Sequence, residues 1–425
     1  MRFFCTLALS LSATLASLAQ DTVRLSLDSC LNYAYKHNTT LQSSRLDQEN
    51  AKIAYDGAKL RFSPTVNASA SQNWSFNDGN SSRNGNYGIN AGLVLFGGLS
   101  NLNNLQQAKL SMEQSELKAE QNRNQISSQI IQAYLTVMMN QEKLQYEHEV
   151  LRYSEEQASE GELKWSVGRM LESDYLLLKA NLSSAKANID NTRLTIASNM
   201  LALQTLLNPE SGIVVAPIYN MDKMTPQSLM SLDSVMQMAQ RNMPDFRISE
   251  MNVELARYNV RMAQGNYMPT LSMNAGASYY EGKNGQVDNS GTLVSSGGVN
   301  SSVGLSLNVP ILNQGNNRTQ LKQSKINLQQ AEIAHQQQTL DLRKEVETQY
   351  LTTQQAYNQY QSSEKLKEAY KASYDVYALK YSEGMVTTVE LLQQQDKYLN
   401  ALNSYLQNKY NYILDNEVLN IYIGQ

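Results

Sequence analysis

The segment from Leu27 to Thr65, LDSCLNYAYKHNTTLQSSRLDQENAKIAYDGAKLRFSPT, returns without a gap from Leu232 to Thr270 as LDSVMQMAQRNMPDFRISEMNVELARYNVRMAQGNYMPT. Both copies open with Leu-Asp-Ser and close with Pro-Thr. Each copy continues into two stretches of alternating polar and apolar residues, and then into a long segment without proline. Self-similarity over such a distance indicates that the chain contains two copies of one structural unit.

Four stretches, at 65–76, 86–95, 270–279 and 299–309, alternate apolar and polar residues. A period of two predicts a strand with one apolar and one polar face, and about 10 residues suffice for a tilted strand to cross a bilayer. The intervening segments 77–85 and 281–298 are rich in Gly, Asn and Ser, which predicts exposed hairpin loops. Two hairpins on a sandwich outside any membrane are the alternative.

Aromatic residues gather toward the loop-side ends of these stretches, where a transmembrane barrel carries its interfacial girdle. The predicted girdle consists of Trp74, Phe76, Tyr87, Tyr279 and Tyr280. Four strands cannot close a barrel, and an open edge in lipid leaves backbone groups unpaired. We therefore expect several chains to contribute strands to one barrel; about twelve strands, from three chains, form the smallest barrel with a usable lumen.

Two long helices are predicted after the second strand of each repeat, from Leu99 to about Glu160 and from Gln314 to about Glu383. Each carries two separate rows of apolar residues at heptad spacing. The first helix has Leu105, Met112, Ala119 and Ile126 beside Leu110, Leu117 and Ile131; the second has Leu321, Leu328, His335 and Leu342 beside Ile326, Ile333 and Leu340. Two narrow seams imply a neighbour on each flank and water on the other faces, as in the wall of a hollow helical cylinder.

The N-terminus has the pattern of a secretory signal peptide: Arg2, then the apolar stretch 3–15, then a small-x-small cleavage signature ending at Ala19. The sequence after this signal contains no run of about 18 apolar residues, so it predicts no membrane-spanning helix. Cys30 is the one cysteine outside the signal, and its place in an amphipathic stretch predicts a packed thiol. A formal net charge of −4 argues against nucleic acid as a partner.

No motif for enzymatic chemistry occurs. The three histidines have no metal-ligand spacing, and the serines lie in no nucleophile elbow or phosphate-binding loop. We therefore expect no catalytic, metal or cofactor site.

A further repeated signature follows the long helices. It comprises Trp165, Ser166, Val167 and Gly168 followed by Asp174, and Tyr381, Ser382, Glu383 and Gly384 followed by Glu390. With the duplicated strand-strand-helix unit and the turns at 95–98 and 310–315, this signature resembles the TolC family of outer-membrane efflux proteins. The resemblance covers essentially the whole mature sequence.

The resemblance implies a mainly α fold with a transmembrane β-barrel: a homotrimer in which a 12-stranded barrel, four strands per chain, continues into a long periplasmic α-helical barrel. It places the protein in the outer membrane of a Gram-negative bacterium, extending into the periplasm. Its implied function is the exit duct of a tripartite efflux system for small toxic compounds, with a periplasmic adaptor and an inner-membrane transporter as partners. A type I protein-secretion duct is the alternative, and a non-transporting periplasmic coiled coil is a third possibility.

The same resemblance assigns the helix turns at Gly168 and Gly384 to the periplasmic tip. Asp174 and Glu390 fall on positions of the acidic rings that line the constriction, with Glu172 nearby, and Tyr381 falls on a tyrosine that helps to hold the closed state. Val386 stands where some members carry an arginine partner of that latch. The alternative is that these carboxylates only favour the N-termini of helices.

The expected organisation follows the repeat. It comprises a signal peptide (1–19), N-terminal periplasmic helices (20–64), a first transmembrane hairpin (65–96), a first helical-barrel hairpin (97–207), an equatorial linker (208–230), periplasmic helices of the second repeat (231–269), a second transmembrane hairpin (270–310) and a second helical-barrel hairpin (311–425).

Overall fold

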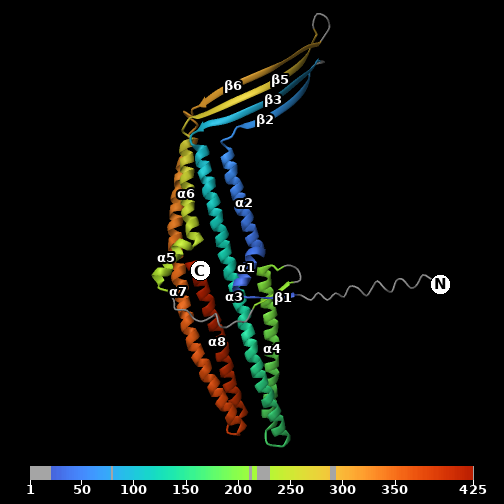
Figure 1. Cartoon of the computed structure of the whole chain (residues 1–425), viewed down its shortest axis with the longest axis vertical. Helices are drawn as coiled ribbons and strands as arrows, with labels where there is room; N and C mark the ends of the chain where they lie inside the picture. The colour runs from blue at the N-terminus through green and yellow to red at the C-terminus, as the bar shows by residue number, and fades with distance from the viewer. Residues whose placement is uncertain (1–20, 78–79, 210–212, 218–229, 288–292, 425) are drawn as a thin grey trace, which may run out of the picture. The chain divides into compact units, whose positions relative to one another are not determined.

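The computed structural model describes residues 21–77, 80–209, 213–217, 230–287 and 293–424. The predicted signal peptide (1–19) and most of the predicted linker (208–230) lie outside these residues. Each half of the chain has the same order of elements (Figure 1). The first half contains β1 (Asp21–Leu25), α1 (Leu27–His37), α2 (Thr39–Leu60), β2 (Thr65–Asn77), β3 (Asn80–Gly97), α3 (Ser100–Ser166) and α4 (Glu172–Leu207). The second contains β4 (Ile213–Pro217), α5 (Leu232–Asn242), α6 (Pro244–Gly265), β5 (Thr270–Val287), β6 (Leu293–Asn308), α7 (Asn316–Ser382) and α8 (Thr388–Ile423).

Matching helices of the two halves have equal lengths. Helices α3 and α7 both contain 67 residues, and α4 and α8 both contain 36. Ser26 caps α1 and Ser231 caps α5, each by accepting a hydrogen bond from the backbone N–H three residues on. The two long helices occur where the sequence predicts them, although α3 continues to Ser166, beyond its expected end near Glu160.

The chain forms two compact units. The first contains the described residues of 1–44, 120–243 and 341–425, and the second contains those of 45–119 and 244–340. Strands β2, β3, β5 and β6 form an antiparallel sheet in that order within the second unit. The predicted mainly α chain with four antiparallel strands is confirmed. Within the described residues no helix is apolar and long enough to cross a membrane.

The strands are longer than the sequence predicts. Pairing between β2 and β3 continues to Asn77 and Asn80, and pairing between β5 and β6 to Val287 and Leu293. The prediction of loops over 77–85 and 281–298 is therefore wrong for 77, 80–85, 281–287 and 293–298, while 78–79 and 288–292 lie outside the described residues. Cross-strand pairing outweighs the weak β propensity of Gly, Asn and Ser in these segments.

Strict alternation over 86–95 predicts Leu95 on the apolar face of β3, but a β-bulge changes this. The register between β3 and β5 shifts between Val94 and Phe96, so that Phe96 lies opposite Leu271. Phe96, and not Leu95, therefore continues the apolar row of Leu93, because a bulge adds one residue to one strand only.

The two short strands β1 and β4 form a separate parallel pair, from Asp21 opposite Ile213 to Leu25 opposite Pro217. The predicted equatorial linker (208–230) contains β4, but the sequence gives no prediction of β1, which falls in the segment expected to be helical (20–64). Strands of five residues are too short for a recognisable alternation.

The core of the first unit contains side chains of α1, α3, α4, α7 and α8. Cys30 is fully buried in it, as expected for a packed thiol, and burial raises the pKa of the thiol to about 12. Tyrosines fill much of the seam between α7 and α8: Tyr374 stacks on Tyr398 with ring centroids 6.1 Å apart, and Tyr360 lies 5.9 Å from Tyr405.

Candidate duct surfaces on the sheet and at the helix turns

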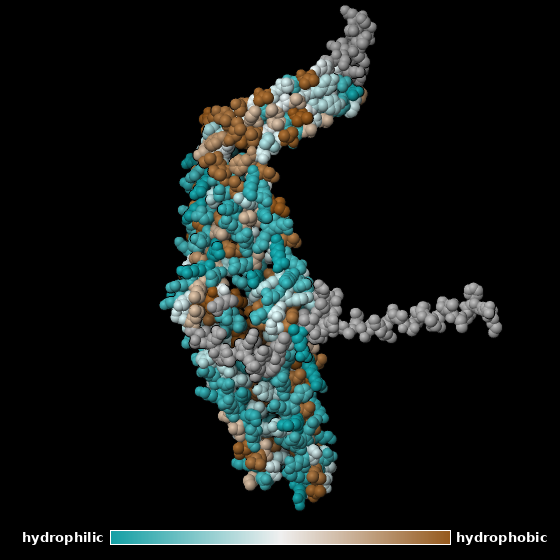
Figure 2. All heavy atoms as spheres, in the orientation of Figure 1, coloured by the Kyte–Doolittle hydropathy of each residue, from teal (hydrophilic) through white to brown (hydrophobic). Residues whose placement is uncertain are grey.

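The sheet places its apolar residues in rows that cross all four strands. Val66, Ala91, Ala275 and Val303 are successive partners in one row, because paired residues of an antiparallel sheet point to the same face. Val66 is 65% exposed and Val303 73%. Figure 2 shows hydrophobic side chains over the strands, most densely at the end nearest the helices of the same unit. The sheet thus presents a broad exposed apolar face.

Four of the five predicted girdle residues lie on this face. Tyr87 and Tyr279 are cross-strand partners with ring centroids 6.5 Å apart, and Tyr87 Oη donates a 3.0 Å hydrogen bond to Gln72 Oε1. Trp74 and Phe76 continue the same face along β2 and are 62% and 82% exposed. Tyr280 lies on the opposite face, because it pairs with Asn86. The register therefore separates Tyr280 from the other four residues.

The opposite face of the sheet is polar. Its rows carry hydroxyl, amide and glycine positions, including Asn67, Asn90, Gly276 and Ser302 as successive partners. An exposed sheet with one apolar and one polar face is suited to separate lipid from water.

The two helix hairpins of the first unit turn in the same way. Gly168 and Gly384 both have a φ of 72°, and each donates its N–H to the carbonyl three residues back, Trp165 at 2.9 Å and Tyr381 at 3.0 Å. The next residue in each turn donates to the carbonyl five residues back. A Cβ at either glycine would meet nothing within 4 Å, so the backbone angle alone requires glycine.

Glu390 closes a capping box at the start of α8. Its Oε2 accepts hydrogen bonds from Thr387 N (2.8 Å) and Thr387 Oγ1 (2.9 Å), while Thr387 Oγ1 accepts from Glu390 N (3.2 Å). The bond from the Thr387 backbone, followed by the bond from its hydroxyl, lowers the pKa of the Glu390 carboxyl. Glu390 is exposed, and one of its oxygens is thus engaged by its own helix.

The start of α4 differs. Leu171 occupies the N-cap position without a side-chain cap, and Glu172 and Asp174 lie in the first turn. Glu172 is exposed and Asp174 half-buried. Trp165 stacks on Tyr175 across the turn, with centroids 5.1 Å apart. Asp174 and Glu390 thus occupy matching positions of the two hairpins but make different local contacts.

Tyr381 lies buried at the turn between α7 and α8. Its hydroxyl is 3.4 Å from Thr388 Oγ1, and Lys164 Nζ lies 5.3 Å from the centre of its ring. The Lys164 contact comes from α3, so Tyr381 links the two hairpins near their turns.

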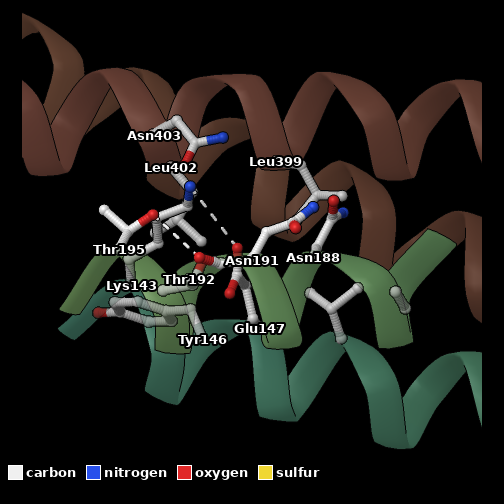
Figure 3. Close-up of a pocket in the computed structure, with 12 residues that line it drawn as sticks. Lys143, Tyr146, Glu147, Asn188, Asn191, Thr192, Thr195, Leu399, Leu402 and Asn403 are labelled. Atoms are coloured by element: carbon white, nitrogen blue, oxygen red, sulfur yellow. Dashed lines mark hydrogen bonds and ion pairs between the residues drawn. The ribbon is translucent and has the colours of Figure 1, made fainter. Parts of the chain in front are cut away.

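A cavity of about 240 Å³ lies among α3, α4 and α8 (Figure 3). Asn188, Asn191, Thr192 and Asn403 contribute polar groups to its lining. Lys143 Nζ is 3.6 Å from Glu147 Oε1, which is an ion pair within one helix. A cavity of this size and polarity accommodates several water molecules. In the part of the chain that the structure describes, no group of three or more His, Cys, Asp or Glu side chains could hold a metal ion.

The model of the outer membrane efflux protein family matches residues 30–209 and 235–425. The chain belongs to the outer membrane efflux protein family. The predicted resemblance to TolC-like proteins is thereby confirmed. As a member of this family, the protein is a transport channel of the outer membrane that extends into the periplasm, and it is not an enzyme.

Solved structures of outer-membrane channels share the fold of this efflux protein. CusC, described as forming a transmembrane channel, is 19% identical, with a TM-score of 0.80 over 95% of this chain and 92% of its own. VceC of Vibrio cholerae is 16% identical, with a TM-score of 0.77 over 94% of this chain and 96% of its own. CmeC of Campylobacter jejuni is 20% identical, with a TM-score of 0.76 over 94% and 85%. None of the curated proteins matches the chain.

Proposed function

We propose that three copies of this efflux protein form one exit duct, which passively conducts small toxic compounds from a periplasmic adaptor and an inner-membrane pump to the exterior. The observation that carries the proposal is an asymmetry between the two halves of the chain. Residues that are buried between the hairpins in one half have exposed counterparts in the other.

Aligning α3 with α7, and α4 with α8, end to end identifies these counterparts. Leu135 of α3 is 2% exposed, whereas its counterpart on α7, Leu351, is 62% exposed. Tyr410 of α8 is 5% exposed, whereas its counterpart on α4, Leu194, is 70% exposed. Because α8 packs on the first hairpin, the same contact made by α4 of a neighbouring copy on the second hairpin would bury both exposed leucines. An open hollow on α7, whose lining includes Leu351 and Asn358, is the proposed contact surface for α4 of the neighbouring copy.

The second unit has matching edges. Strands β2 and β6 are the outer strands of the sheet, with one hydrogen-bonded neighbour each among the described strands. They run antiparallel to one another, so β6 of one copy can pair with β2 of the next in an all-antiparallel barrel. The helices next to these strands carry exposed apolar rows at heptad spacing: Leu46, Ile53 and Leu60 on α2, and Ile326, Ile333 and Leu340 on α7.

Cysteine cross-linking tests the assembly. With Cys30→Ala as background, the pair Ile53→Cys and Ile333→Cys should cross-link between copies in outer-membrane fractions, and the ladder should stop at the trimer. The matched control pairs Ile53→Cys with Leu117→Cys, because Leu117 is the buried counterpart of Ile333 on α3. Monomers alone for Ile53 and Ile333, or an open-ended ladder, would contradict a closed trimer.

We propose further that Asp174 and Glu390 converge on the axis of the trimer. Six carboxylates in a narrow aqueous ring would favour cations and bind divalent ions. The combined substitution of Asp174→Asn and Glu390→Gln should weaken cation preference and divalent block in planar bilayers, while Glu383→Gln, an exposed control at the same turn, should change neither. Unchanged reversal potential and divalent block would leave both carboxylates only the role of favouring the N-termini of their helices.

The turns at Gly168 and Gly384 are the proposed docking surface for the adaptor. Single cysteines near these turns should cross-link to the adaptor in cells, whereas cross-links confined to the region of β4 would contradict this docking. The cargo is tested by deletion: greater sensitivity to small toxic compounds supports efflux, and loss of a secreted protein would instead identify a type I secretion duct.

A further inference from the structure

A buried charged cluster joins the two hairpins of one chain. The carboxylate of Glu142 on α3 is 2% exposed and accepts three hydrogen bonds from α8: Lys409 Nζ lies 3.0 Å from Oε1 and 2.8 Å from Oε2, and Tyr410 Oη lies 2.8 Å from Oε2. Lys409 is also largely buried, with 14% of its side chain exposed. We call Glu142, Lys409 and Tyr410 the inner lock.

The hydrogen bonds of the inner lock depend more strongly on the relative position of α3 and α8 than apolar packing does. A carboxylate out of water requires its donors, so sliding of α8 along α3 would leave a buried charge unpaired. Apolar side chains tolerate such shifts better, because the hydrophobic effect has no direction. Because removal of either partner would leave the other charge buried and uncompensated, the cluster couples the position of α8 to that of α3.

The second half of the chain has no such cluster at the matching positions. The counterpart of Glu142 on α7 is Asn358, and the counterparts of Lys409 and Tyr410 on α4 are Arg193 and Leu194. Asn358 is exposed and uncharged. The side chain of Arg193 is 57% exposed, and its Nη1 lies 3.8 Å from Oδ1 of Asp190 on the same helix. In the proposed trimer these residues would meet between copies, with an amide where the inner lock has a carboxylate.

We propose that the inner lock holds the joint between hairpins of one chain rigid, and that the helical wall of the duct opens at the three joints between chains. The inference rests on the proposed trimer. The proposed duct contains six similar hairpins, two from each chain. Its wall would nevertheless move as three units, because the two hairpins of one chain stay together. Glu142 acts here as a positioning residue and contacts no cargo.

Two matched cysteine pairs test the proposal in the Cys30→Ala background. Glu142→Cys with Lys409→Cys bridges the joint within a chain, and Asn358→Cys with Arg193→Cys bridges the equivalent joint between chains. Each pair is bridged with a bis-methanethiosulfonate reagent, because side chains that meet at their tips leave their Cβ atoms too far apart for a direct disulfide. The bridge is reopened with dithiothreitol, and transport is measured as conductance of the purified trimer in planar bilayers and as drug resistance of cells.

Bridging between chains should lower open-state conductance at least about fivefold, reversibly, whereas bridging within a chain should leave it near that of the wild type. Equal inhibition by both bridges, or inhibition by the inner bridge alone, would overturn the proposal. Failure of Asn358→Cys and Arg193→Cys to form any inter-chain bond, with no trimer by light scattering, would instead reject the assembly itself.

A transplanted lock gives a second test without cross-linking. Asn358→Glu, Arg193→Lys and Leu194→Tyr together reproduce the inner lock between chains, and this variant should form trimers with reduced opening. The control variant, Asn358→Gln with Arg193→Lys and Leu194→Tyr, lacks the carboxylate and should open as the wild type does. Unchanged conductance in the glutamate variant, with the trimer intact, would contradict the proposal.

Discussion

At each helix turn a single glycine adopts a left-handed backbone conformation, with a φ of 72° at both Gly168 and Gly384. Substitution of Gly384 by Ala should destabilise the hairpin by about 1 kcal/mol, because L-residues avoid this region, and Asn should cost less. Thermal unfolding followed by circular dichroism measures the difference. Gly57→Ala is the matched control: its added methyl also meets nothing within 4 Å, but it lies inside α2 and should be neutral or stabilising. Equal effects at Gly57 and Gly384 would contradict the conformational argument.

The capping box of Glu390 predicts a dependence on pH. The Glu390 pKa in the folded protein lies below its usual value of 4.5, so the stabilising effect of the carboxylate is present above that pH and is lost as the pH falls through the lowered pKa. The wild type should therefore melt at a higher temperature than Glu390→Gln at neutral pH, and this difference should shrink in acid well below 4.5. A difference that grows on acidification would be inconsistent with the capping bonds from Thr387.

Only some of the side-chain contacts of the two hairpins can be predicted from the sequence. Thr387 and Glu390 form a Thr-x-x-Glu pattern, which is a local signal for a capping box. Glu142 and Lys409 carry no such signal, because they lie on helices far apart in the chain and their contact depends on tertiary packing. The buried position of Tyr381, together with its contact to Lys164, likewise depends on how the two hairpins pack.

The register of the sheet determines which strand residues lie on its apolar face and which lie on its polar face. Ile89 lies on the apolar face and is 58% exposed, whereas the adjacent Asn90 lies on the polar face. If the apolar face contacts lipid, Ile89→Lys should disfavour the assembled state by about 2–4 kcal/mol near mid-membrane, and Asn90→Lys should be tolerated. Outer-membrane fractionation and heat-modified migration of the trimer report the outcome. Equal tolerance of both lysines would place the apolar face away from lipid.

The strands also mark the limits of prediction from sequence. Alternation identifies all four strands of the sheet, because one face is apolar over most of each strand. It does not extend into 80–85, which contains no apolar residue, so that pairing alone defines the strand there. The pattern also leaves out Phe96, because a bulge breaks the strict period of two on which it depends.

In the whole molecule, leucines at matching positions of the two repeats lie in different environments. Leu135→Ala should destabilise the folded chain by about 3 kcal/mol, since its side chain is buried within the protomer. Its counterpart, Leu351→Ala, should leave the fold of the protomer intact and weaken the trimer. Unfolding measurements and size-exclusion chromatography with light scattering separate the two effects. A comparable loss of protomer stability at Leu351 would mean that this position is not an interface between copies.

The parallel pair of β1 and β4 has a consequence for the order of biogenesis. In a chain that crosses the inner membrane N-terminus first, β1 emerges almost at once, yet its pairing partner follows only after the entire first repeat has been exported. The parallel pair can therefore form only once Ile213–Pro217 has crossed, which makes it a late contact although β1 lies at the start of the described chain.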